Sequence, residues 1–255
     1  MHDTSPDGDP GRLTTKNRKG SRQVPIHDPL RRLAIVTSLL AIVISVPSTV
    51  AFYVAFGGSI DGMLFGAPGT ILGHGSSAAV FLRWGAIGDM FYSYVLLVPL
   101  ALYLHQRLRP RMPWLADLGT VAGLAYMFVG GAGAAILAIA GSALVEAYSK
   151  AAPADQFAIA TSFDMLRRIV FLALWQTLDA ITLGTWLLSV GWLIRPERQA
   201  LGRLLILAGV GLFGASLITM LGVSSVALIG GGASIVLVVW AGWLIFDRPR
   251  PAPKA

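Results

Sequence analysis

Residues 33–56 read LAIVTSLLAIVISVPSTVAFYVAF, and this stretch decides the fold class. It contains no charged side chain. At about 1.5 Å per residue, a helix of this length crosses most or all of a hydrocarbon core of about 30 Å. Five further long apolar runs follow, at residues 78–104, 115–145, 165–194, 204–221 and 226–246. The sequence therefore predicts an all-α integral membrane bundle of six transmembrane helices.

The composition agrees with a membrane protein. The chain is 55% hydrophobic and only 13% charged, so lipid rather than water must solvate much of its surface. The first apolar run is too long for the apolar core of a cleaved signal peptide, and it follows 32 mostly polar residues. We expect residues 1–32 to form a disordered, basic cytoplasmic tail. A transmembrane domain then covers residues 33–246, and residues 247–255 form a short cytoplasmic C-terminal tail.

The basic residues predict the orientation of the bundle. Sixteen of the twenty Lys and Arg lie in the two tails and in the second and fourth gaps between apolar runs. The first and fifth gaps contain none, and the third contains only Lys150. Positive residues resist translocation, so both termini and the two basic gaps are expected to be cytoplasmic. This distribution also accounts for the net charge of +7, and we expect no nucleic-acid partner.

Several chemistries lack the residues they need. The chain has no cysteine, which excludes disulfides, thiolate metal sites and cysteine-bound iron–sulfur clusters. Of the four histidines only His105 reaches the end of an apolar run, so no histidine pair can hold a haem inside the bundle. No lysine lies within a run, so a retinal Schiff base has no attachment point. We expect neither a cofactor nor a metal.

Two carboxylates, Asp89 and Asp179, lie inside predicted spans, where ionisable groups are costly and often functional. Counted from the cytoplasmic helix ends, Asp89 lies about 24 Å and Asp179 about 21 Å along its helix. These similar depths would let the two acids face each other if their helices are neighbours. The candidate polar site consists of the two acids, polar residues at helical spacing from them, and arginines near the outer ends of the same spans: Asp89, Asp179, Gln176, Tyr92, Arg83 and Arg168.

Structural and catalytic readings compete with solute or proton handling. In the structural reading, Asp89 pairs with Arg83 or Arg168, and Asp179 is a neutral, hydrogen-bonded acid that holds helices in register. In the catalytic reading, the two acids act as in intramembrane aspartyl proteases, one of whose acids lies in a Gly-x-Gly-Asp motif. Here the four residues that end at Asp89 read Ala-Ile-Gly-Asp, so the first glycine is missing. The sequence does not favour an enzyme.

Small residues four apart predict where helices touch, because they let two backbones approach closely. The pairs are Gly119 with Gly123, Gly131 with Ala135, and Gly211 with Ala215. They indicate that the third and fifth spans are central in the bundle. Pro47 and Pro99 are expected to kink the first and second spans.

Two segments resemble a known family. The stretch FLRWGAIGD at residues 81–89, with RLRP at 107–110, resembles the second-span signature of a bacterial multi-pass membrane family catalogued as a domain of unknown function. The segments GWLIRP at 191–196 and LGRLL at 201–205 are similar to a later signature of that family. The resemblance covers roughly residues 33–225. It implies a fold of six or seven spans but no settled activity.

We therefore expect a multi-pass protein of a bacterial cytoplasmic membrane that handles a small solute, an ion or protons through the buried polar site. The alternative is a noncatalytic accessory or scaffold subunit. Its partners would be the lipid bilayer, other membrane helices or further copies of the same chain.

Overall fold

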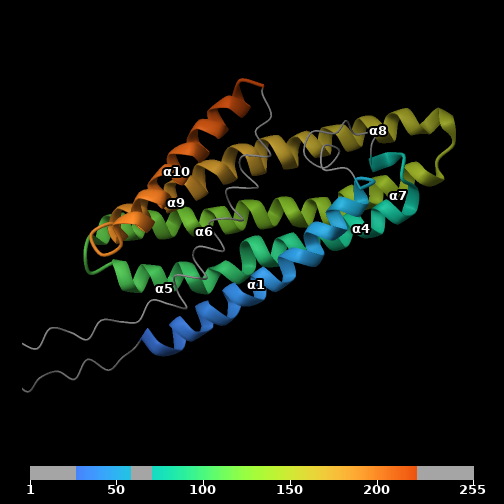
Figure 1. Cartoon of the computed structure of the whole chain (residues 1–255). Helices are drawn as coiled ribbons and strands as arrows, with labels where there is room; N and C mark the ends of the chain where they lie inside the picture. The colour runs from blue at the N-terminus through green and yellow to red at the C-terminus, as the bar shows by residue number, and fades with distance from the viewer. Residues whose placement is uncertain (1–26, 59–70, 223–255) are drawn as a thin grey trace, which may run out of the picture.

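The computed structural model describes residues 27–58 and 71–222, and within these ranges all regular structure is helical, with no strand. The helices join end to end into five rods (Figure 1). The first rod is α1 (His27–Ala55) and the last is α10 (Gln199–Met220). The second rod comprises α4 (Gly75–Asp89), the π-helix η1 (Met90–Tyr94), the 3-10 turn η2 (Val95–Leu97) and α5 (Val98–Leu108). The third comprises α6 (Pro113–Ile136), the π-helix η3 (Leu137–Gly141) and α7 (Ser142–Lys150). The fourth comprises α8 (Pro153–Arg167), the π-helix η4 (Arg168–Asp179) and α9 (Ala180–Ile194).

Four described helices are long and apolar enough to cross a membrane: Pro29–Ala55, Gly75–Leu108, Pro113–Lys150 and Gln199–Met220. The all-helical, membrane-type fold predicted from the sequence is confirmed at this level. The predicted count of six is not established by the described residues. The fourth predicted run, 165–194, lies in the rod that contains η4, which is not one of these four. The sixth, 226–246, lies outside the described residues, as does the predicted C-terminal tail.

The ends of α1 correct one predicted boundary. The helix begins at His27, so residues 27–32 belong to α1 and not to the disordered tail expected for residues 1–32. At its other end, the amide of Gly58 donates to the carbonyl of Tyr53 and the amide of Gly57 to that of Val54. This pair of hydrogen bonds closes the C-terminal end of a helix when the residue just past that end has a left-handed backbone conformation. Gly57 has this conformation, with a φ of 73°.

The second rod is irregular just before Pro99, where the sequence predicted a kink. A proline has no amide hydrogen and its ring crowds the carbonyl four residues earlier, which here belongs to Val95. The chain between Asp89 and Val98 forms a π-helix and then a 3-10 turn before α5 resumes with Pro99 in its first turn. The irregular stretch therefore begins directly after the first candidate acid, Asp89.

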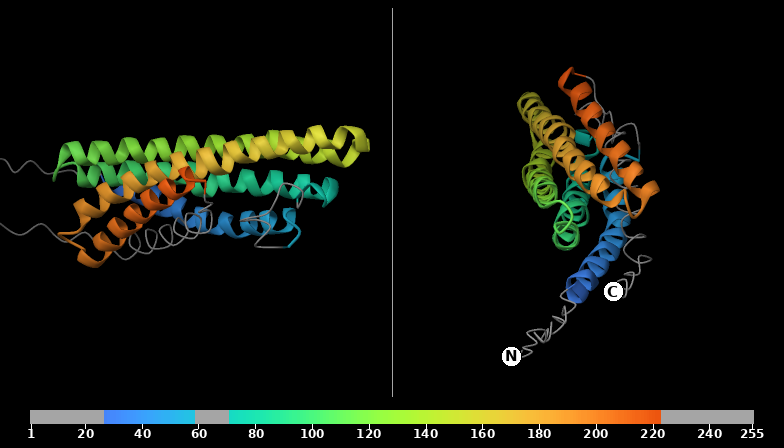
Figure 2. Two further views of the ribbon diagram at one scale, coloured as in Figure 1. Left: turned by 90° about the horizontal axis from the view of Figure 1, so that it is seen from above. Right: turned by 90° about the vertical axis from the view of Figure 1, so that its left-hand side faces the viewer.

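The helix α6 lies between the second and fourth rods. It packs against α9 and η4 on one side and against η1 and α5 on another (Figures 1 and 2). The third span therefore packs against two other rods, as a central span would, but one of its faces is uncovered in the described structure, where Val121 and Phe128 are exposed. The described residues do not test the same prediction for the fifth span: within them α10 packs chiefly against α9 and η4, and the sixth run lies outside them.

Glycines lie where the helices of the bundle make close contact. A Cβ on Gly119 would lie 2.8 Å from Ser189, and one on Gly123 would lie 2.9 Å from the Trp186 ring, so these two glycines let α6 approach α9. No described atom lies within 4 Å of the Cβ position of Gly211, so the described residues do not test the helix contact predicted there. The contact of α10 with α9 instead uses Gly209, whose Cβ would lie 2.7 Å from Leu188.

Charged side chains gather at the two ends of the rods. The turns between α5 and α6 and between α9 and α10 lie at one end, called here the arginine-rich end (Arg107, Arg109, Arg111, Arg195, Arg198 and Arg203), and the turn between α7 and α8 lies at the other (Figure 1). At the arginine-rich end Glu197 pairs with Arg107 at 3.2 Å and with Arg111. These ion pairs join the two turns, α5–α6 and α9–α10.

Asp164, near the end of α8, lies three and four residues before Arg167 and Arg168, which is ion-pair spacing on a helix, and it pairs with both. It binds Arg168 at 2.8 Å and Arg167 at 3.1 Å. The hydrogen bond from Arg168, assisted by Arg167, lowers the pKa of Asp164 from its ordinary value, and burial opposes this only in part.

Candidate functional site

The centre of the candidate site is a hydrogen bond between two rods. The hydroxyl of Tyr94, at the end of η1, donates to Oδ2 of Asp179, at the end of η4, at 3.0 Å. Both residues are buried, with 5% of each exposed. The other oxygen of Asp179, Oδ1, is buried and has no hydrogen-bond partner among the described residues. A buried carboxylate oxygen without a donor is costly, so it indicates a place for a proton, a cation or a water molecule.

The second acid lies near the first. Asp89 is close enough to Asp179 for the two carboxylates to interact electrostatically. Its Oδ1 accepts a hydrogen bond from Ser93 at 2.9 Å, and the Tyr92 side chain interacts with its carboxylate. The structure therefore brings together Asp89, Tyr92 and Asp179 of the predicted site.

Two glycines of α6 make room for the aromatic side chains of the site. A Cβ on Gly130 would lie 1.9 Å from the ring of Tyr94, so only glycine fits there. The carbonyl of Gly130 also accepts a hydrogen bond from the indole of Trp175 at 3.1 Å, and a Cβ on Gly133 would lie 2.7 Å from the same indole nitrogen. These contacts fix α6 against both rods that carry the acids.

Gln176 lies one helical turn before Asp179 but faces α10. Its Oε1 accepts a hydrogen bond from Thr219 at 3.4 Å, and the hydroxyl of Ser216 donates to the carbonyl of Thr177 at 3.3 Å. Gln176, Ser216 and Thr219 are all buried. This polar contact joins η4 to α10, so Gln176 has a structural partner separate from the two carboxylates.

The two arginines of the predicted site lie elsewhere. Arg83 donates to the hydroxyl of Ser142 at 3.2 Å, and Arg168 pairs with Asp164. Both side chains are exposed. Neither forms an ion pair with Asp89 in the part of the chain that the structure describes. The structural reading, in which Asp89 pairs with one of these arginines, therefore has no such ion pair to support it there. An arginine has a long side chain that reaches the helix end, where water or headgroups solvate its charge.

Tyr94, Tyr126 and Trp175 are site residues that sequence reasoning missed. Tyr94 lies five residues after Asp89, which in a regular α-helix is off the face defined by three- and four-residue spacing. The π-helix from Met90 to Tyr94 changes that relation, because its turn closes five residues apart. The adjacent Gly130 and Gly131 were the only signal in the sequence of a bulky side chain packed against α6.

The site can chemically hold a proton or a small cation. Both of its acids lie beside π-helical segments, which in proteins often mark functional positions. No group of three or more His, Cys, Asp or Glu suited to a metal ion occurs among the residues described. The polar groups of the site are carboxylate and tyrosine oxygens. A proton can pass between such oxygens along a hydrogen bond.

Comparisons of the chain with protein-family models, with curated proteins and with solved structures find no match.

Proposed function

We propose that this chain is a multi-pass membrane protein that handles protons or another small solute through the polar site of Asp89 and Asp179. The observation that carries the proposal is the buried Oδ1 of Asp179, which has no donor among the described residues although a second carboxylate lies nearby. Two acids close together inside an apolar bundle favour sharing a cation, because two bare negative charges repel strongly there. Close packing around Tyr94 suits a proton or a small cation better than a large solute.

The membrane setting is part of the proposal. We place the protein in a bacterial cytoplasmic membrane with six spans and both termini in the cytoplasm, supported by the distribution of Lys and Arg. The sixth span would be residues 226–246. The resemblance of residues 81–89 and 191–196 to the bacterial family of unknown function supports the same placement.

A second candidate is a noncatalytic accessory or scaffold subunit. The observation in its favour is the surface of α10, where Gly211 and Gly214 have nothing within 4 Å of their Cβ positions in the described structure. Helices associate in lipid through such small-residue surfaces. The partner in that case would be another membrane helix or a further copy of this chain.

Replacement of each acid by asparagine separates the two candidates. We expect Asp179→Asn and Asp89→Asn to be produced at near-normal folded yield in detergent, because asparagine keeps the shape and can still accept a hydrogen bond. In lipid vesicles under a pH gradient, proton flux should fall about tenfold or more in Asp179→Asn, as expected when a group that must carry the proton is removed.

Normal folded yield together with normal flux in both variants would refute the transport proposal and favour the accessory subunit. A loss of yield without any flux defect in the remaining folded protein would instead assign the acids a structural role. Asp117→Asn is a matched control, because Asp117 is a half-exposed acid that pairs with Arg109 at 3.3 Å near the arginine-rich end.

A further inference from the structure

The α9–α10 turn carries positive charge that its own acid does not balance. Residues 195–203 contain three arginines and one acid, Glu197. Glu197 pairs with two arginines of the neighbouring α5–α6 turn, Arg107 and Arg111. Two arginines of the α9–α10 turn, Arg195 and Arg203, form no ion pair with an acid within residues 27–58 and 71–222. Both side chains are exposed, so their charges are available to an anion from outside the chain.

Gly202 brings these two arginines together. A Cβ on Gly202 would lie 2.6 Å from the Cα of Arg195, so the backbone of α10 rests directly on the end of α9. Arg203 is the next residue of α10, and its side chain therefore starts close to that of Arg195. One helical turn earlier in α9, a Cβ on Gly191 would lie 2.9 Å from the carbonyl oxygen of Gly202, which keeps the two helices in contact.

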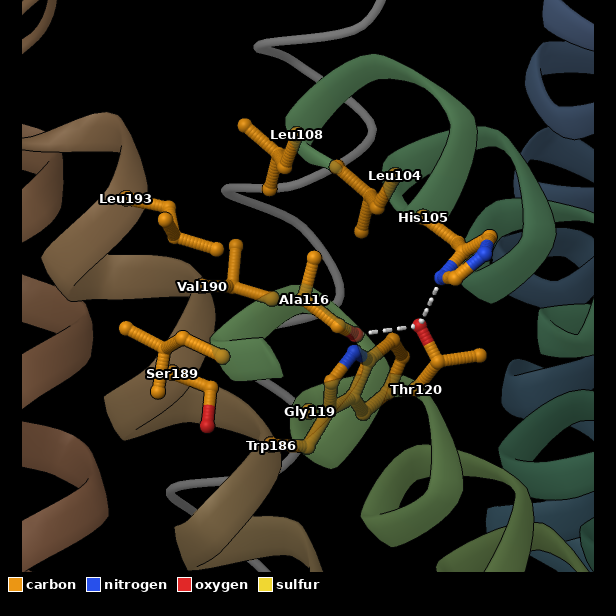
Figure 3. A pocket seen from close by; sticks show the side chains of 11 residues that line it. Leu104, His105, Leu108, Ala116, Gly119, Thr120, Trp186, Ser189, Val190 and Leu193 are labelled. Atoms are coloured by element: carbon orange, nitrogen blue, oxygen red, sulfur yellow. Dashed lines mark hydrogen bonds between the residues drawn. The ribbon is translucent and has the colours of Figure 1, made fainter. Parts of the chain in front are cut away.

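Trp192 holds the guanidinium of Arg195 on the outside of the bundle. The guanidinium carbon of Arg195 lies 4.9 Å from the centroid of the Trp192 ring, a cation–π contact, and Trp192 is 52% exposed. Val190 and Leu193 of the same helix point instead toward Leu108 of α5, across an apolar wall inside the bundle (Figure 3). Trp192 and Arg195 therefore face the surroundings. Tryptophan prefers the headgroup level of a membrane, where an arginine meets phosphate groups.

An apolar stripe continues from Arg203 along the exposed face of α10. Leu207 and Val210 lie four and seven residues after Arg203, which places all three on one face of the helix. Leu207 is 70% exposed and Val210 is 57% exposed. The helix is one of the four described helices that are long and apolar enough to cross a membrane. This face therefore presents a cation at one end of an apolar stripe, and a lipid with an anionic headgroup and apolar chains has the complementary pattern.

We propose that Arg195 and Arg203 bind the phosphate of an anionic glycerophospholipid, whose acyl chains lie along Leu207 and Val210 of α10. The planar guanidinium group matches two phosphate oxygens with parallel hydrogen bonds. An anionic lipid fits this site better than a zwitterionic one, because a zwitterionic headgroup carries its own cation beside the phosphate. A lipid fits it better than free phosphate, which would leave the apolar stripe unused. The inference needs only that α10 lies in a membrane, and it is independent of proton handling at the two acids.

The first test compares lipid retention by the full chain in a mild detergent. Native mass spectrometry would follow phosphatidylglycerol and phosphatidylcholine with identical acyl chains, added at equal concentration. Wild type should retain phosphatidylglycerol in preference. Arg195→Gln and Arg203→Gln should each lower its retention about fivefold, the effect of removing one cation near an anionic lipid surface.

Arg109→Gln is the matched control for both variants. Arg109 is 59% exposed at the same end of the rods, but it already pairs with Asp117. Its replacement removes the same charge and should leave the retention of phosphatidylglycerol unchanged. Thermal unfolding without lipid, followed by circular dichroism, should be the same in all three variants as in wild type, because the replaced side chains are exposed.

The second test separates a lipid from its phosphate. Inorganic phosphate carries the same kind of anion without acyl chains, so a large excess of it should not displace phosphatidylglycerol from wild type. Displacement would overturn the proposal, because the ligand would then be phosphate and not a lipid.

Two further results would also overturn the proposal. One is equal retention of the two lipids by wild type. The other is an equal loss of phosphatidylglycerol in Arg109→Gln and in the two site variants, which would show only a general effect of charge. None of these measurements uses proton flux, so failure of the proposed function at the two acids would leave the lipid site standing.

Discussion

Gly130→Ala is expected to destabilise the folded protein by about 1–3 kcal/mol, the range for overpacking a tight interior. The new methyl group would lie 1.9 Å from the ring of Tyr94, and an aromatic ring has no flexible end that could yield. Either Tyr94 must leave its hydrogen bond with Asp179, or α6 must move away from the rods that carry the two acids. The measurement is thermal unfolding in detergent, followed by circular dichroism, with folded yield as a second readout.

Gly131→Ala is the matched control for this prediction. Gly131 follows Gly130 directly in α6, but the nearest atom to its Cβ position is the Tyr94 Cβ at 3.7 Å, an ordinary van der Waals contact. Alanine also favours helix over glycine, so Gly131→Ala should be neutral or slightly stabilising. Equal stability of the two variants would show that Tyr94 does not pack against Gly130 as described.

Tyr94→Phe is expected to cost about 1–3 kcal/mol of stability, the usual penalty when one partner of a buried hydrogen bond is removed. Phenylalanine keeps the ring and its packing, so the change removes only the hydroxyl that donates to Oδ2 of Asp179. Since Oδ1 already has no donor among the described residues, the carboxyl group would then lack any described partner. The measurement is the same unfolding transition in detergent.

A double-mutant cycle isolates this interaction from effects on packing. In the background of Asp179→Leu, Tyr94→Phe should cost little, because an apolar pair has no unsatisfied group. Tyr126→Phe serves as the stability control, since Tyr126 is buried beside Tyr94 but donates to neither acid in the described hydrogen bonds. If Tyr94→Phe were equally costly with and without the acid, the hydrogen bond to Asp179 would have no energetic role.

The helical class and several contacts follow directly from the sequence. The long apolar runs predicted all-helical rods, because only a helix satisfies every backbone group within one apolar segment. Asp164 lies three and four residues before Arg167 and Arg168 in the sequence, a spacing that favours the ion pairs present in α8 and at its end. Gly119 and Gly123 predicted a close helix contact, although their partner, α9, could not be read from the chain. Local spacing predicts contacts within a helix well and partners between helices poorly.

The candidate site was predictable in its two acids and in Tyr92, which lies three residues after Asp89. Asp89 and Asp179 stand out because ionisable residues are rare in apolar runs. The role of Tyr94 was hidden, because a regular helix was assumed where the chain forms the π-helix Met90–Tyr94. The alternative in which Asp89 pairs with Arg83 or Arg168 is not seen among the described residues. Sequence depth places an arginine near an acid, but the length of its side chain lets it reach Ser142 or Asp164 instead.

Infrared difference spectroscopy during a pH titration tests the central claim most directly, since it detects protonation of a carboxyl group in the reconstituted protein. The spectra of wild type, Asp89→Asn and Asp179→Asn would be compared in the carbonyl region of protonated carboxylic acids. The account predicts a band that changes with pH in wild type, is lost in Asp179→Asn and is altered in Asp89→Asn. Identical difference spectra in all three proteins would contradict a proton-binding site at these acids.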